Sequence, residues 1–208
     1  MNAKPRVFSS EVDTGSHEEE AAKGAPDEPL RWHPASVALH WLTFLLILFQ
    51  FWVSGPMLDE KRDLLSRFEL YQLHKSVGLT VAAFVLLRLL LRVALRQPGP
   101  ENDNPWLRGA ASLVHAALYL CIIALPVTGL LMAAAAPIQI PTLYFGLFSV
   151  PHPIGPDPAV YRRMLWLHDQ FGNILIGLGV VHVAAVAVHM VLWRDGLLGR
   201  MWFGRRWS

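Results

Sequence analysis

The chain of 208 residues has one cysteine, Cys121, and little charge of either sign. A single cysteine cannot form an internal disulfide, so a disulfide-stabilised scaffold is excluded. The formal net charge is only +2 and no basic stripe with interleaved aromatic residues occurs, so nothing points to nucleic-acid binding. Residues 1–31 are polar and lack the apolar core of a signal peptide. We therefore predict a disordered polar tail there.

Hydrophobic residues make up 53% of the chain and gather in four long runs. These runs cover residues 35–55, 76–95, 113–136 and 173–193, and contain no Asp or Glu. Each is close to the roughly 20 residues that a helix needs to cross a membrane. The sequence thus predicts an all-α fold, an integral membrane four-helix bundle.

Proline, glycine and charged residues separate the runs and set the domain limits. We predict one domain over residues 32–203, with spans at about 35–55, 74–95, 112–135 and 168–193, and a basic tail at 204–208. Pro34 lies in the first turn of the first span, where proline is tolerated, and Pro126 is expected to kink the third. The connection 137–166 is rich in apolar residues and proline, which favours a place at the membrane interface.

Lysine and arginine near the span ends indicate the orientation, because cytoplasmic loops carry more of them. One side holds Arg31, Arg92, Arg96, Arg108, Arg194, Arg200, Arg205 and Arg206, and the other holds Lys61, Arg62, Arg67, Lys75, Arg162 and Arg163. The modest excess predicts that both termini are cytoplasmic.

This topology gives each histidine a depth. His40 and His115 lie toward the inner side, whereas His74 and His168 lie toward the outer side. His182 follows His168 by fourteen residues, roughly 21 Å along a helix, and returns to within about 40° of the same face.

The outer layer offers only His74 and His168, from two different helices, and such a pair suits the axial positions of a haem iron. The inner layer offers four candidates: His40, His115, His182 and His189. Pairing through His189 would separate two haems by about 31 Å, so His182 is favoured. His40 is its best-placed partner and His115 competes for either place. For His115 and His189 the alternative is a hydrogen-bonded core histidine or a propionate partner.

Glycine and arginine residues near these histidines agree with a cofactor, although each has another explanation. Small residues such as Gly78, Gly172, Gly177 and Gly179 let a flat ring approach a backbone, and they also serve helix packing. Arg88 lies fourteen residues after His74, at the depth of the inner haem. It could bind a haem propionate or extend its side chain toward the cytoplasm.

Four segments of the chain resemble the bacterial cytochrome b561 family, and the resemblance extends over residues 31–203. The segments are ALHWLTFLLILFQFWVSG, LYQLHKSVGLTVAAFVLLRLLLR, HAALYLCIIALPVTGLLM and LHDQFGN…VHVAAVAVHMVLWRDGLLGRM. The resemblance implies a multi-pass protein of the bacterial cytoplasmic (inner) membrane with two bis-histidine haem b groups. It implies that His40 and His182 bind the inner haem and that His74 and His168 bind the outer one.

The resemblance also implies one-electron transfer from a small-molecule or protein donor at the outer face to membrane quinone, with superoxide and ubiquinone as one version. Whether this makes the protein an enzyme stays open, and no catalytic residue is predicted. An alternative is a haem-bearing membrane anchor of a larger dehydrogenase or hydrogenase. A transition-metal transporter is disfavoured, because the apolar runs hold no carboxylates.

Overall fold

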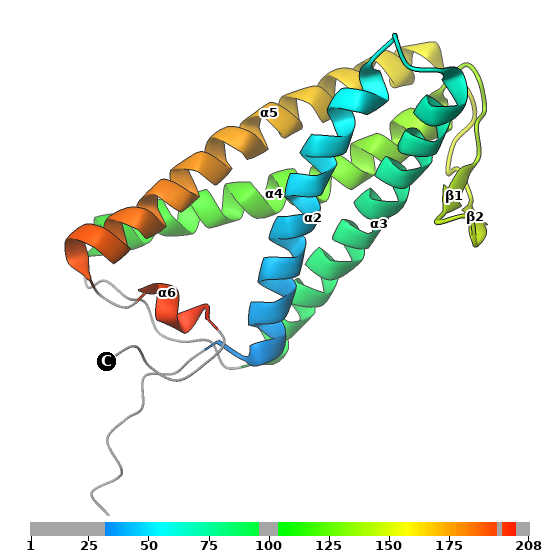
Figure 1. Cartoon of the computed structure of the whole chain (residues 1–208). Coiled ribbons are helices and arrows are strands. Elements are labelled where there is room, and N and C mark those ends of the chain that lie inside the picture. The colour runs from blue at the N-terminus through cyan, green and yellow to red at the C-terminus, as the bar shows by residue number, and fades with distance from the viewer. Residues whose placement is uncertain (1–31, 96–103, 195–196, 203–208) are drawn as a thin grey trace, which may run out of the picture. The chain divides into compact units, whose positions relative to one another are not determined.

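The computed structural model describes residues 32–95, 104–194 and 197–202, so the predicted tails, 1–31 and 204–208, lie outside it. Its long helices are α2 (Pro34–Leu58), α3 (Leu64–Ala94), α4 (Pro105–Ala135) and α5 (Pro158–Val188). A hairpin of β1 (Thr142–Tyr144) and β2 (Phe148–Val150) follows α4 and precedes α5 in the chain, and it lies beside α3 (Figure 1). A π-helical turn, η1 (His189–Trp193), extends α5, and the short helix α6 (Leu197–Arg200) follows.

The predicted all-α membrane bundle is confirmed by the four long helices. Each is long and apolar enough to cross a membrane. Between 6% and 22% of the residues in their most apolar stretches are buried inside the protein, so the protein itself leaves most of these side chains at least partly uncovered. An apolar surface of this extent requires lipid as its solvent.

Helix starts follow from proline and from side-chain caps. Prolines occupy the first turn of three helices, where a missing N–H costs nothing: Pro34, Pro105 and Pro158. The start of α3 is capped by Asp63, whose carboxylate accepts a hydrogen bond from the Ser66 amide at 2.9 Å. Hydrogen bonds from Ser66 lower the pKa of the Asp63 carboxyl below its usual value.

Some helix limits differ from the predicted ones. The helix α4 stays helical through Pro126, and α5 begins at Pro158 instead of near residue 168. The carboxylate of Asp157 accepts hydrogen bonds from two amides of the first turn of α5, which fixes this earlier start. The connection predicted over 137–166 therefore includes the beginning of α5 as well as the hairpin.

Helices α2 and α3 pack together, α4 packs with α5, and α3 also contacts α4 (Figure 1). Their fully buried side chains, such as Val53, Val85, Ala134 and Ala135, are no larger than valine. Small side chains let membrane helices approach closely when lipid gives no hydrophobic drive for association.

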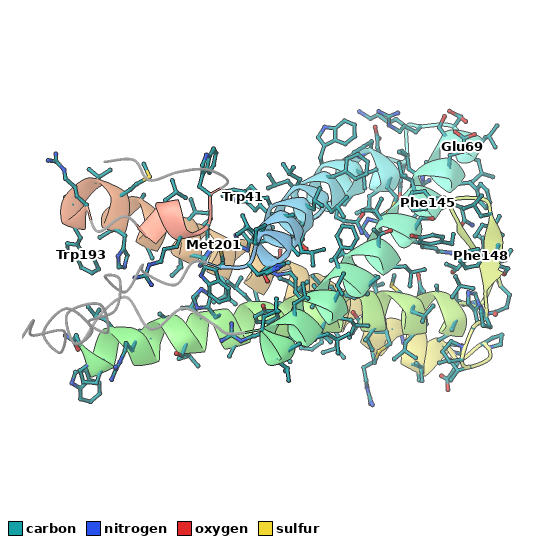
Figure 2. The ribbon with its side chains drawn as sticks, turned by 90° about the horizontal axis from the view of Figure 1, so that it is seen from below. Trp41, Glu69, Phe145, Phe148, Trp193 and Met201 are labelled. Atoms are coloured by element: carbon teal, nitrogen blue, oxygen red, sulfur yellow. The ribbon has the colours of Figure 1, made fainter. Side chains whose placement is uncertain are left out.

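The two ends of the bundle carry different structures. At one end the Trp41 indole donates a hydrogen bond to the Met201 carbonyl at 2.7 Å, which ties the segment after α6 to α2. Figure 2 shows this contact far from Glu69, Phe145 and Phe148, which mark the hairpin end. In the orientation predicted from the sequence, the hairpin end is the outer end. This orientation stays a prediction.

The hairpin is held against α3 by a row of polar side chains one turn apart. The Gln72 side-chain amide donates to the Pro141 carbonyl at 2.8 Å, and its oxygen accepts from the Leu143 amide at 3.0 Å. The Ser76 hydroxyl donates to the Leu143 carbonyl at 3.0 Å and accepts from the Phe145 amide at 2.9 Å. The two strands pair with each other, and side chains of α3 add further hydrogen bonds to the main chain of β1 and the turn.

We expect Gln72→Ala to loosen the hairpin. Two neutral hydrogen bonds are lost, which together contribute about 1–3 kcal/mol to its closed state. Hydrogen exchange at the Phe145 amide, whose own partner is Ser76, should become about 10-fold to 100-fold faster, measured by mass spectrometry in nanodiscs. Glu69→Ala, an exposed site on the same helix, is the control. Unchanged exchange in Gln72→Ala would show that this residue does not fasten the hairpin.

Candidate metal centre

The outer pair, His74 and His168, comes together as the sequence predicts. His74 lies on α3 and His168 on α5, ninety-four residues apart in the chain. Their ring centroids are 6.2 Å apart, and the ring planes make an angle of 68°. Two imidazoles from different helices therefore meet near the hairpin end.

The inner pair, His40 and His182, also comes together, from α2 and α5. Their ring centroids are 6.4 Å apart with an angle of 64° between the planes. His115 of α4 is closer to His182, at 5.3 Å. His40 and His115, which compete for the inner site, therefore both lie beside His182.

These separations can be compared with the size of an axial pair. A metal–imidazole nitrogen bond is about 2.0–2.1 Å long and the nitrogen lies roughly 1.1 Å from its ring centre, so two rings that held one ion from opposite sides would be about 6.2–6.4 Å apart. The outer and inner pairs, at 6.2 and 6.4 Å, match this spacing. The 5.3 Å between His115 and His182 is too short for an ion between them.

The outer rings have nitrogens suited to a metal. The Nδ1 atom of His168 lies 3.1 Å from the Leu125 carbonyl oxygen, which only accepts hydrogen bonds. Nδ1 therefore carries the proton, and Nε2 keeps the lone pair that a metal needs. The buried Nδ1 of His74 has no hydrogen-bond partner in the described part of the chain. A buried polar atom of this kind is rare and fits a missing ligand.

The inner site contains a contact that the sequence did not predict. A guanidinium nitrogen of Arg88 lies 3.1 Å from Nδ1 of His40, and the same guanidinium stands 5.6 Å from the Tyr119 ring centre. Guanidinium only donates, so Nδ1 of His40 accepts and the proton lies on Nε2. Metal binding through Nε2 therefore requires Arg88 to release His40. A propionate is a group that could attract it, as the sequence suggested.

The glycines near these histidines differ in how much free space surrounds them. A side-chain carbon placed at Gly177 or Gly179 would have no atom within 4 Å, so the space beside them is open. At Gly78 such a carbon would lie 3.1 Å from the Gln50 amide nitrogen, which donates to the His74 carbonyl at 3.0 Å. At Gly172 the nearest atom would be 3.9 Å away, on Phe51.

Sequence reasoning missed several residues that contact His168. They are the Leu125 carbonyl at 3.1 Å and the Thr128 hydroxyl at 3.2 Å, and a side-chain carbon added at Gly129 would also meet this ring. The available signal was the PVTG sequence at 126–129, which puts a proline, a hydroxyl and a glycine within one turn of an apolar helix.

His189 and His152 have local partners. His189 packs edge-on against Trp193 at 4.4 Å in η1. His152 is partly buried beside the hairpin, where its Nε2 lies 3.1 Å from the Thr142 hydroxyl. Burial, followed by the nearby positive charge of Lys75, lowers the pKa of the His152 imidazole. The folded protein therefore favours the neutral form of the His152 imidazole.

Among residues 32–95, 104–194 and 197–202, no group of three or more His, Cys, Asp or Glu side chains could hold a metal ion. The paired histidines thus suit a cofactor that brings its own equatorial donors. Haem is such a cofactor, since its ring supplies four nitrogens and the protein supplies the axial ligands.

Four membrane helices with paired imidazoles define the class of membrane-bound b-type cytochromes. A family model described as prokaryotic cytochrome b561 matches residues 31–204. The chain belongs to the prokaryotic cytochrome b561 family, and it is a haem b-binding electron carrier of the bacterial inner membrane with several spans.

Similar proteins agree with this family. "Cytochrome b561 homolog 2" of Escherichia coli K12 is 30% identical over 181 residues, which cover 83% of this chain and 92% of the relative. "Cytochrome b561 homolog 1" of the same organism is 24% identical over 172 residues, covering 82% and 96%. "Probable superoxide oxidase CybB" of Yersinia pestis is 27% identical over 173 residues, covering 79% and 92%.

Proposed function

We propose that this protein binds two haem b groups, each between two histidines, and carries single electrons between an outer-face donor and membrane quinone. The observation that carries this proposal is the presence of two histidine pairs from different helices, with centroids 6.2 and 6.4 Å apart. In this proposal His74 and His168 are the outer ligands, His40 and His182 are the inner ligands, and Arg88 binds an inner propionate.

The side chains and helices of this chain hold and shield the cofactor. Bound haem iron changes its charge by one electron, which is the chemistry the protein itself lacks. The helices supply imidazoles at two depths and keep water away with apolar side chains. The domain that does this extends over residues 32–203, with both termini in the cytoplasm.

Superoxide is the donor we propose, and ubiquinone the acceptor. The name of the Yersinia relative supports this choice. Cationic side chains at the hairpin end support it as well, since exposed Lys61, Arg62, Arg162 and Arg163 attract an anion. Acidic Asp59, Glu60 and Asp157 reduce the local positive charge.

Stopped-flow spectroscopy on the purified protein tests this function. We expect superoxide to reduce the haems of the isolated protein in nanodiscs and added ubiquinone to reoxidise them. The reduction rate should fall as salt is raised, because steering of an anion is screened. Reduction by quinol but not by superoxide would overturn the proposed donor. Obligate co-purification with a catalytic subunit would favour the membrane-anchor function instead.

A further inference from the structure

We propose that Gly129, Thr128 and the Leu125 carbonyl form a docking site that fixes the ring of His168 and presents its Nε2 to the metal. This inference rests on the proposed function, in which His168 is an outer ligand. The three residues are positioning residues, because they act through the His168 ring.

Because Gly129 has no side chain, the ring of His168 can reach the carbonyl oxygen of Leu125. In an α-helix a carbonyl accepts from the amide four residues later, and for Leu125 that residue is Gly129. A side-chain carbon at Gly129 would lie 3.3 Å from Cε1 and 3.5 Å from Nδ1 of His168. The first distance is tighter than ordinary van der Waals contact, so alanine would push the ring away from the carbonyl.

Thr128 completes the docking site on the same turn. Its hydroxyl lies 2.8 Å from the Ala124 carbonyl and 3.0 Å from the Leu125 carbonyl, and donates its hydrogen to the helix backbone. The hydroxyl oxygen can then accept from Nδ1 of His168, which lies 3.2 Å away. The Nδ1 proton therefore lies between two acceptors, and this fixes both the tautomer and the direction of the ring.

A similar arrangement is found at the other outer histidine. The carbonyl of His74 accepts a second hydrogen bond, from Gln50 of α2 at 3.0 Å, and the residue four positions later is again a glycine, Gly78. Helix α3, which carries His74, and helix α4, which contacts His168, thus each have a glycine four residues after a carbonyl that also bonds to a neighbouring helix.

A hydrogen bond from Nδ1 makes an imidazole a stronger donor to a metal and orients it. A more basic ligand favours the oxidised iron. Weakening the docking site should therefore raise the midpoint potential of one haem and leave the other unchanged. Damage to general packing would instead lower the stability of the protein and disturb both haems.

The test compares Gly129→Ala with Gly109→Ala, a glycine of the same helix with no atom within 4 Å of an added side-chain carbon. Redox titration and low-temperature electron paramagnetic resonance would be recorded on the haem-loaded proteins. In Gly129→Ala we expect one of the two steps to shift upward by a tenfold change in the reduced-to-oxidised ratio, or about 59 mV, with a changed low-spin signal. Gly109→Ala should keep both steps.

Thr128 variants and His168→Ala complete the design. Thr128→Val should shift the same step by a smaller amount, and Thr128→Ser should restore it, because only the hydroxyl is needed. A Gly129→Ala protein that matches Gly109→Ala in both readouts overturns the inference, and so does an equal shift of both steps. If His168→Ala keeps both haems, the proposed ligation itself fails. If His168→Ala loses one haem while Gly129→Ala has no effect, only the docking site fails.

Discussion

Replacing His168 with alanine should reduce the haem content from about two groups per chain to about one. The loss follows from the outer pair, because none of the other described histidines faces His74. His74→Ala should give the same content and the same residual spectrum, because both variants empty one site. The measurement is a pyridine haemochrome assay set against protein concentration, with reduced absorption spectra of each variant.

The matched control for the outer pair is His152→Ala. His152 lies at the same end and is partly buried, but its contacts are to Thr142 and Gln139 of the connection. This variant should keep about two haems. Full haem content in both His74→Ala and His168→Ala would contradict the outer ligands.

Replacing His182 should remove the inner haem whichever residue is its partner. His40 and His115 both face His182, at centroid separations of 6.4 and 5.3 Å. We expect His40→Ala to lose the same haem and His115→Ala to keep it, because only the longer separation leaves room for an ion. The readout is again the haem content of each variant, together with the spectrum of the haem that remains.

The opposite pattern would reassign the inner site. Loss of the inner haem in His115→Ala, with retention in His40→Ala, would show that His115 is the ligand. His40 would then be a hydrogen-bond partner of Arg88. This outcome has a physical basis, because a guanidinium nitrogen of Arg88 already lies 3.1 Å from Nδ1 of His40.

The sequence predicted the four spans and the meeting of His74 with His168 and of His40 with His182. Helix rise and membrane thickness determine depth, so each histidine could be placed in a layer from its position in a span. The family and the location in the bacterial inner membrane were also predicted correctly.

The angular positions of neighbouring helices are harder to predict, because they depend on packing between helices. The depth of His115 is compatible with pairing to His40 or to His182, and only the structure gives its short separation from His182. The contact between Arg88 and His40 depends on the same packing.

The hairpin was missed for a related reason. Residues 142–150 have no strict alternation of apolar and polar side chains, and some of their main-chain hydrogen bonds are made with Gln72 and Ser76 of a distant helix. The docking of His168 on Leu125 likewise uses a backbone carbonyl, which no side-chain pattern reveals.

The most direct test of the two proposed haem sites is the haem-to-chain ratio of the purified full-length protein, with pyridine haemochrome absorbance set against quantitative amino-acid analysis. Two histidine pairs predict a ratio of about two, with two separable one-electron steps in a redox titration. A ratio of about one, with a single step, would contradict the assignment of His40 with His182 and His74 with His168 as two separate haem sites.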